Sequence, residues 1–526
     1  MQQNFLIGIG GTGARTLEAA IHLAAAGLGP DRLTVFLVDP DMSNGNLVRT
    51  SNLLASYKTT RSALKTSAAD PDMRLFHTEI ISPDPLVWGL GEHNHTLGKY
   101  LNFAGAKETP LGKFMSVLFS SEELNTELNE GFRGHPSIGA VLLASTNMAE
   151  EPWKTFWSRI HDCAENDARV FMVGSIFGGT GAAGVPTFGA PDMLKFAEAA
   201  TITPRDRESA IAGRSRIHLG AALVLPYFSV VADDSVSEGD LFVTSSDFPI
   251  ATKAALQFYA DKPELAFDEM YLIGDSLAHK VGAFSKGSKK QQNRAHYVEA
   301  ATALAAFDFY AQPKPAGGIA EPKVFSTARA SSIVDWQSLP VARAQTDVPA
   351  RQAEAKLRLT AFATFAYAVC TYGEAFRAAS DAQEFAARHW VRSFGKDKGD
   401  PRTDPESVAS LTAASAALRR FLEWISELDN ENVQLFDRSK FWEGDAASVL
   451  VPAYRNGEPT QAISTLVKAG GGLGLRFGEF VNAMDLRSKT AALQNVRPAD
   501  RFLQLFYGAA LDFCRSNYFG QAAKGN

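Results

Sequence analysis

The sequence Phe5-Leu-Ile-Gly-Ile-Gly10-Gly-Thr-Gly-Ala14 joins a short apolar run to a glycine-rich turn, and helix-forming residues follow from 14 to 26. The pentapeptide Gly-Gly-Thr-Gly-Ala occurs again at residues 178–182, and it also follows an apolar run, at 170–173. Glycines let the backbone approach a phosphate closely, and the free N–H groups at a helix start attract an anion. One such turn is weak evidence, because each glycine run alone could be a tight turn. Two copies at neighbouring strand ends would hold a phosphate chain from two sides.

Strand and helix patterns alternate through the first half of the chain. Apolar runs at residues 33–38, 219–225 and 270–273 predict three further strands, and residues 153–164 and 251–259 predict helices between strands. Continuous apolar strands that alternate with helices indicate a parallel sheet covered on both faces. In such sheets, ligands bind at the carboxyl ends of the strands. The expected fold class is therefore α/β, with a Rossmann-like domain.

Beyond about residue 340 the pattern becomes mainly helical. Helices are predicted at residues 347–394, 406–429, 459–468, 476–490 and 498–518, with a flexible connection near 395–405. We expect two domains. Residues 1–311 form a nucleotide-binding domain that ends in a central helix, and residues 312–526 form a mainly helical C-terminal domain.

Composition and charge restrict the class of protein. The chain of 526 residues is 45% hydrophobic and 21% charged, as in ordinary globular proteins. A formal net charge of -6 gives no basic footprint for nucleic acid or for an anionic membrane. The N-terminus lacks the basic segment of a signal peptide, and Arg358 interrupts the most apolar stretch. We expect a cytoplasmic protein with no membrane span and no nucleic-acid partner, and three widely spaced cysteines fit a reducing compartment.

Both glycine-rich segments resemble loops of one family. Ser175-Ile-Phe-Gly-Gly-Thr-Gly-Ala-Ala-Gly184 resembles the tubulin signature loop, with Phe177 where that loop has its first glycine, and Gly8-Ile-Gly-Gly-Thr-Gly-Ala-Arg15 resembles the first phosphate loop of FtsZ. The resemblance covers roughly residues 5–275 and places the chain nearest the divergent bacterial tubulin-like proteins. It implies a tubulin/FtsZ-type domain that binds GTP or GDP. On the matching positions it implies nucleotide contacts from Gly10, Gly11, Thr12, Arg15, Gly178, Gly179, Thr180 and Gly181.

Two more segments match the family in their order along the chain. Val38-Asp39-Pro-Asp41, followed by Val48-Arg49-Thr50, is similar to the second loop of tubulin. This likeness implies that Asp39 and Asp41 lie beside the nucleotide's Mg²⁺, an ion that prefers oxygen ligands. Gly131-Phe-Arg-Gly134-His-Pro136-Ser-Ile-Gly139 is similar to the FtsZ loop that senses the γ-phosphate, which implies a nucleotide contact from Gly134.

A later segment, Phe267-Asp-Glu-Met-Tyr-Leu-Ile-Gly-Asp275, resembles the strand that presents an asparagine to the guanine base. Asp275 takes the asparagine position. A carboxylate there could accept hydrogen bonds from guanine N1–H and N2–H₂, which adenine does not offer. The alternative is that Asp275 is a loop or helix-cap residue.

The chain departs from the family in the segment thought to complete the GTPase site. Tubulins and FtsZ hydrolyse GTP with an acidic loop that follows the central helix and is donated by the next subunit. The central helix is predicted here at residues 294–310, and the segment at 311–324 offers one carboxylate, Glu321, without the Asn-x-Asp-x-x-Asp pattern of FtsZ. Glu321 is therefore the catalytic candidate. We expect either a weak, assembly-dependent GTPase or a nucleotide-dependent switch whose helical C-terminal domain binds a second copy or a protein partner.

A different class of nucleotide-binding protein also fits part of the sequence. Gly8-x-Gly10-x-x-Gly13, with Asp39 at the end of the next strand, meets the dinucleotide-binding fingerprint of NAD enzymes. The run from Asp39 to Arg49 is also similar to ThiF-like enzymes, which adenylate a carboxyl terminus with ATP. Neither class needs a second glycine loop at residues 178–182. The guanine-nucleotide interpretation is therefore preferred, and the other two remain as alternatives.

Overall fold

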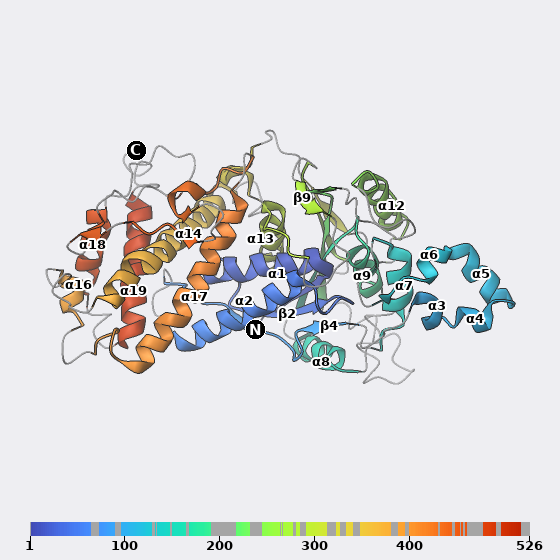
Figure 1. Ribbon diagram of the computed structural model, residues 1–526, viewed down its shortest axis with the longest axis horizontal. Coiled ribbons are helices and arrows are strands. Elements are labelled where there is room, and N and C mark those ends of the chain that lie inside the picture. The colour runs from blue at the N-terminus through green and yellow to red at the C-terminus, as the bar shows by residue number, and fades with distance from the viewer. Residues whose placement is uncertain are drawn as a thin grey trace.

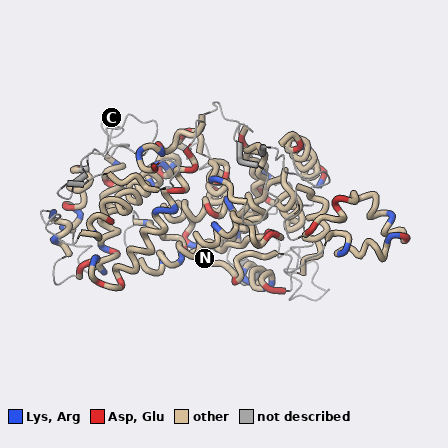
Figure 2. Tube along the Cα trace, viewed as in Figure 1, with Lys and Arg blue, Asp and Glu red and all other residues tan. Residues whose placement is uncertain are grey.

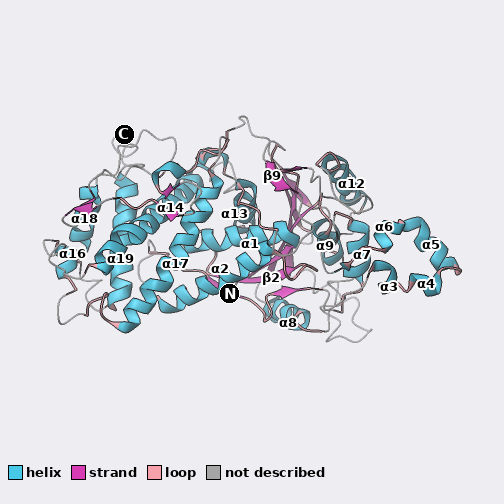
Figure 3. Ribbon diagram, in the orientation of Figure 1, coloured by secondary structure: helices cyan, strands magenta, loops and turns pink. Residues whose placement is uncertain are grey.

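In the computed structural model, one mostly parallel sheet forms the centre of the fold (Figure 3). The strand order is β10-β8-β6-β5-β1-β2-β3, and β4 also pairs with β2. The strands are β1 Gln3–Ile9, β2 Arg32–Val38, β3 Glu79–Ile81, β4 Val87–Trp88, β5 Ala168–Ser175, β6 Ile217–Val224, β8 Glu269–Ile273 and β10 Lys323–Phe325. The neighbours run parallel throughout this path. The predicted α/β class with a parallel sheet is confirmed, and the five predicted strands are β1, β2, β5, β6 and β8.

The structure describes 26 separate stretches of the chain. They are residues 2–64, 73–89, 96–128, 132, 134–147, 150–164, 168–190, 217–231, 245–262, 265, 267–276, 280–283, 291–312, 322–326, 333–339, 348–379, 385, 388–394, 399–429, 432–443, 448–452, 454–455, 458–459, 466, 477–490 and 496–516.

Helices cover both faces of the sheet (Figure 1). On one face lie α1 Gly10–Ala25, α2 Gly45–Ala63 and α13 Tyr297–Ala311, and on the other lie α7 Pro136–Ala144, α8 Trp153–Ala164, α9 Thr180–Phe188 and α12 Phe248–Asp261. The reason is visible in β1, where Phe5, Ile7 and Ile9 enter one hydrophobic core and Leu6 enters the other. Because side chains alternate across a strand, apolar residues at every position demand cover on both sides.

The predicted central helix is present as α13, and it is buried along almost its whole length. Residues 297–310 are all buried, and the helix has apolar or small residues on every side. A helix that is apolar all round is stable only when it is surrounded by protein. Its start is fixed by a capping box in which His296 accepts from the Val298 N–H and Glu299 accepts from the His296 N–H.

Helices predominate among the described residues of the C-terminal half. These helices are α14 Val348–Ala368, continued through a π-helical turn at Val369–Gly373 into α15 Glu374–Ala378, then α16 His389–Arg392, α17 Pro405–Leu428, α18 Phe477–Arg487 and α19 Pro498–Cys514. The helix predicted at 459–468 is wrong at its first residue, because Pro459 lies in strand β14 Glu458–Pro459, paired with β13 Tyr454–Arg455. The prediction is also wrong at residue 466, which lies in a bend, and its other residues lie outside the described ranges.

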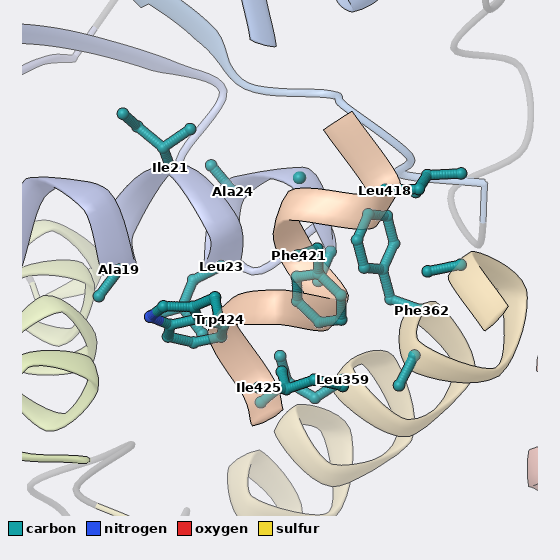
Figure 4. Close-up of a cluster of buried hydrophobic side chains, with 14 of the residues drawn as sticks. Ala19, Ile21, Leu23, Ala24, Leu359, Phe362, Leu418, Phe421, Trp424 and Ile425 are labelled. Atoms are coloured by element: carbon teal, nitrogen blue, oxygen red, sulfur yellow. The ribbon is translucent and has the colours of Figure 1, made fainter. Parts of the chain in front are cut away.

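The C-terminal helices pack directly against helix α1 (Figure 4). Leu23 of α1, Phe421 of α17 and Phe362 of α14 lie in one core, and the rings of Phe362 and Phe421 meet edge to face at 4.6 Å. His22 of α1 stacks on Trp424 of α17 with ring centroids 5.0 Å apart. The two halves of the chain therefore share a core, and a domain division at residues 311 and 312 remains a prediction.

A helical arm projects from one end of the molecule, on the right of Figure 1. It consists of α3 Leu97–Tyr100, α4 Phe103–Ala106, α5 Pro110–Leu118 and α6 Ser121–Leu124, and the sequence analysis did not predict it. Basic and acidic residues are interspersed along the described chain (Figure 2). Among the helices described, none is both long and apolar enough to cross a membrane.

Candidate functional site

The two copies of Gly-Gly-Thr-Gly-Ala face each other at the carboxyl edge of the sheet. Strands β1 and β5 are hydrogen-bonded neighbours, with Gly8 in register with Val173. Helix α1 begins directly after β1, and α9 begins a few residues after β5. A Cβ atom placed on Gly10 would lie 3.3 Å from Thr180 Cβ and 3.5 Å from the Gly181 nitrogen. The prediction that the two copies lie at neighbouring strand ends is confirmed.

Both helices begin without a side-chain cap. The residues before them, Ile9 and Gly179, provide no capping hydrogen bond, and neither first turn contains an acidic residue. The first N–H groups of an α-helix have no partner within the helix and carry partial positive charge. Two uncapped, acid-free helix starts that lie close together can attract an anion, and phosphate is the anion that such starts commonly hold.

Helix α1 starts earlier than the sequence predicts, and this changes the role of its glycines. The predicted start was residue 14, but Gly10 is already helical in its hydrogen bonding, with φ at 73°. Only glycine adopts that backbone angle without strain. A Cβ on Gly13 would lie 2.5 Å from the Gly8 carbonyl carbon, so Gly13 allows the helix to pack against the strand that precedes it. The glycine run is the first turn of the helix and not a loop before it.

The third predicted segment contacts the second glycine copy. A Cβ on Gly179 would lie 2.9 Å from Phe132 Cβ and 3.0 Å from the Gly134 nitrogen. Gly134 has φ at 80°, and Pro136 begins α7 two residues later. The ring of His135 lies 3.1 Å from Glu123 Oε1 of the arm. The structure therefore brings Gly134 beside Gly179 and connects this segment to α6.

Asp39 and Asp41 form a buried turn between β2 and α2. Asp39 Oδ1 accepts from the Asp41 N–H at 3.0 Å, and Asp41 Oδ1 accepts from the Ser43 N–H and hydroxyl at 3.1 and 2.8 Å. Both side chains are buried, with Asp39 4% exposed and Asp41 2% exposed. Burial raises the pKa of Asp39 to about 7, although the bond from the Asp41 N–H acts in the opposite direction.

These two carboxylates are suitable partial ligands for Mg²⁺. Asp39 Oδ2 makes no hydrogen bond within the described residues, and a carboxylate whose charged form is disfavoured by burial gains from a nearby cation. The described chain contains no group of three or more His, Cys, Asp and Glu residues able to hold a metal. Mg²⁺ is usually held by one or two carboxylates together with the phosphates of a nucleotide, which matches this donor set.

Two asparagines near the glycine segments were missed by the sequence analysis. Asn46, in the first turn of α2, has Nδ2 3.7 Å from the Cβ position of Gly11. Its Oδ1 accepts from the Asn293 N–H at 3.0 Å, so the segment before α13 reaches the site. Asn44 caps α2 by accepting from the Asn46 N–H at 2.9 Å. The signal available in the sequence was this asparagine cap, which directly follows the acidic pair.

Arg15 is buried and already paired. Its Nε lies 2.8 Å from Glu299 Oε1 of α13, and its guanidinium also donates to the Tyr227 hydroxyl. That hydroxyl in turn donates to Glu299 Oε1 at 2.8 Å. Arg15 is 4% exposed and Glu299 1%. In the structure Arg15 thus joins the first helix to the central helix, and its predicted contact with a nucleotide remains a prediction.

The last two predicted residues lie farther along the chain. Asp275 follows β8, at the same carboxyl edge of the sheet as the two glycine segments. Strand β6 lies between β8 and β5. Its N–H donates to the Pro226 carbonyl at 3.3 Å, and its Oδ1 accepts from the Ser276 N–H at 2.7 Å. Asp275 is partly buried, and its part in reading a base remains a prediction. Glu321 lies outside the described residues.

No protein-family model matches this chain, and no curated protein sequence matches it. The functional conclusion therefore depends on the geometry of the site and on the motifs that form it.

Proposed function

We propose that this protein binds a guanine nucleotide with its phosphates between the starts of α1 and α9. It would then be a tubulin-like protein that acts as a weak GTPase or as a nucleotide-dependent switch. One observation carries the proposal: two uncapped, glycine-rich helix starts converge, with the Cβ position of Gly10 3.3 Å from Thr180 Cβ. A diphosphate or triphosphate chain is long enough to accept hydrogen bonds from both sides of such a cradle.

The order of the strands supports the position of the ligand. The chain leaves β1 toward β2 and β3 on one side, and β5, β6 and β8 follow on the other side. Ligands of open parallel sheets bind where the order reverses, which here is between β1 and β5. Dinucleotide-binding folds share this order, so the order by itself supports the place of binding and not the identity of the ligand.

The alternative of an NAD-binding or adenylating enzyme needs a different role for Asp39. In dinucleotide-binding folds the acidic residue at the end of the second strand accepts from the ribose hydroxyls. Asp39 is 4% exposed, and one of its oxygens already accepts from the Asp41 N–H. A buried carboxylate with a raised pKa is better suited to a cation beside phosphates than to two ribose hydroxyls. This supports Mg²⁺ as the partner of Asp39 and Asp41.

Equilibrium binding of labelled GTP, with unlabelled GDP, ATP and NAD as competitors, tests the proposal. GDP should compete, whereas ATP and NAD should compete at least tenfold more weakly. The Asp275→Ala variant should lose part of this discrimination, because an acceptor that pairs with a base contributes about 1–3 kcal/mol. Asp261→Ala, at the exposed end of α12, is the control and should bind as the wild type does. Binding of ATP or NAD without binding of GTP would favour the alternative enzymes.

A further inference from the structure

A charged cluster joins helix α17 to the segment that enters the candidate site. Arg49 of α2 donates to Glu18 Oε2 of α1 from Nε at 3.1 Å and from a terminal nitrogen at 2.8 Å. Its other terminal nitrogen lies 3.8 Å from Glu427 Oε2 of α17. The same Glu427 oxygen accepts from the Ala295 N–H at 2.6 Å. One side chain of α17 thus contacts both α2 and the segment before α13.

The segment before α13 also contacts a residue of the candidate nucleotide site. Asn293, two residues before Ala295, donates its N–H to Asn46 Oδ1 at 3.0 Å. Asn46 lies one helical turn before Arg49 on α2 and beside the Cβ position of Gly11. The segment is therefore fixed at Asn293 by a residue of the candidate site and at Ala295 by α17. A displacement of either contact strains the other, because the two lie only two residues apart.

Glu427 occupies a position that an isolated helix would disfavour. It lies in the last turn of α17, where the carbonyl ends carry partial negative charge, and that turn contains no basic residue. Burial raises the pKa of Glu427, although Arg49 and the Ala295 N–H act in the opposite direction. Burial likewise raises the pKa of Glu18 to about 7. Loss of the contacts to Arg49 and Ala295 would leave a poorly solvated acid at the end of the helix.

The end of α17 also borders a space that side chains do not fill. A cavity of about 290 Å³ lies between this end of α17 and helices α1 and α2. Its lining includes Glu18, His22, Arg49, Arg420, Trp424 and Glu427. A protein interior is normally close-packed, so a position beside a cavity is held by specific contacts more than by general packing. At the end of α17, the specific contacts are those that Glu427 makes with Arg49 and the Ala295 N–H.

We propose that Glu427 couples nucleotide binding to the position of α17: an occupied phosphate cradle fixes Asn46 and the 293–295 segment, and that segment holds α17. This inference rests on the proposed function of the site. Coupling between two sites is reciprocal, so removal of the α17 contact must weaken nucleotide binding by the same factor that nucleotide binding stabilises α17. Helix α17 lies outside the part of the chain that resembles tubulin and FtsZ.

Hydrogen–deuterium exchange of the full chain, with and without saturating GDP and Mg²⁺, measures this coupling. In the wild type, GDP should slow exchange across residues 419–428 by about fivefold or more. In Glu427→Gln this slowing should disappear, and the affinity for GDP should fall by about fivefold to thirtyfold. The matched control is Glu479→Gln in α18, away from this cavity, where the side chain is exposed and the change should leave both quantities unaltered.

A second variant separates coupling from simple loss of the fold. Glu427→Asp retains the charge near Arg49 and is one methylene shorter, so it should lose the Ala295 contact and with it the effect of GDP on α17. If GDP binds equally to the wild type and both variants, and exchange across 419–428 does not respond to GDP in any of them, the coupling is refuted and the binding function stands. If the wild type does not bind GDP, the proposed function itself is refuted.

Discussion

Gly10 and Thr180 lie in contact at the starts of α1 and α9: a Cβ atom on Gly10 would lie 3.3 Å from Thr180 Cβ. Each residue lies at the start of a helix that follows one of two adjacent parallel strands, β1 and β5. Neither helix start has a side-chain cap, so no capping side chain satisfies its first N–H groups.

Gly11→Val should abolish nucleotide binding without unfolding the protein. A Cβ at Gly11 would meet only the Asn46 amide at 3.7 Å, which is ordinary contact, so the fold tolerates a side chain there. The branched side chain would occupy the space meant for phosphate oxygens. The matched control is Gly478→Val in α18, where a Cβ would meet nothing within 4 Å. Calorimetric titration with GDP and a thermal melt of each variant provide the test, and wild-type affinity in Gly11→Val would mean that this segment is only a turn.

Mg²⁺-dependent binding should weaken below about pH 7. Burial raises the pKa of Asp39 to about 7, so the carboxyl is protonated below that pH and must lose its proton to bind the ion. The apparent Mg²⁺ affinity should fall about tenfold per pH unit below 7 and stay level above it. Asp39→Asn should remove this slope and leave GDP binding without Mg²⁺ largely intact. Titrations between pH 5.5 and 8.5 measure both, and an unchanged slope in the variant would exclude Asp39 as the titrating ligand.

The buried pair of Arg15 and Glu299 should be important for stability. Glu299→Gln or Arg15→Met leaves one charge buried without its partner, which typically costs about 3–5 kcal/mol in the free energy of unfolding. Removing both charges together should cost less than the sum of the two single changes. Urea denaturation of the three variants measures these values. A cost below about 1 kcal/mol for each single variant would show that the pair contributes little to the fold.

Turnover of GTP should be slow and should rise with protein concentration. A water-positioning carboxylate from a neighbouring subunit contributes about 10²–10⁴-fold to hydrolysis, and the chain offers Glu321 after the central helix without the family's full acidic pattern. Steady-state phosphate release across a range of protein concentrations checks this expectation. A fast rate independent of concentration would place the catalytic groups within one chain. If the rate depends on concentration and Glu321→Ala does not change it, hydrolysis still requires assembly, but Glu321 is not the catalytic carboxylate.

The sequence predicts the centre of the fold well because the signal there is local. An apolar run such as 33–38 is long enough to be a buried strand, and the structure has β2 at Arg32–Val38. The helical arm from α3 to α6 was not predicted, because its helices are short and leave large apolar side chains exposed, including Leu111, Phe114 and Val117. Periodicity cannot identify a helix that has no buried face.

The sequence indicates which residues belong to the candidate site, but it does not indicate which contacts those residues make. The sequence treats Gly11 and Gly179 alike, whereas a Cβ on Gly179 would lie 2.9 Å from Phe132 Cβ and 3.0 Å from the Gly134 nitrogen. Gly179→Val should therefore disturb the fold as well as the binding of phosphate. The pairing of Arg15 with Glu299 joins residues that are 284 positions apart in the sequence (299 − 15). No local pattern encodes a contact of that kind.

A crystal structure of the protein with GDP and Mg²⁺ would test the central claim most directly. We expect one nucleotide whose β-phosphate accepts hydrogen bonds from the first N–H groups of both α1 and α9, with the ion on the side of Asp39 and Asp41. Phosphates that contact the start of α1 alone, with the ribose hydroxyls on Asp39, would refute the guanine-nucleotide site and assign the protein to the dinucleotide-binding class.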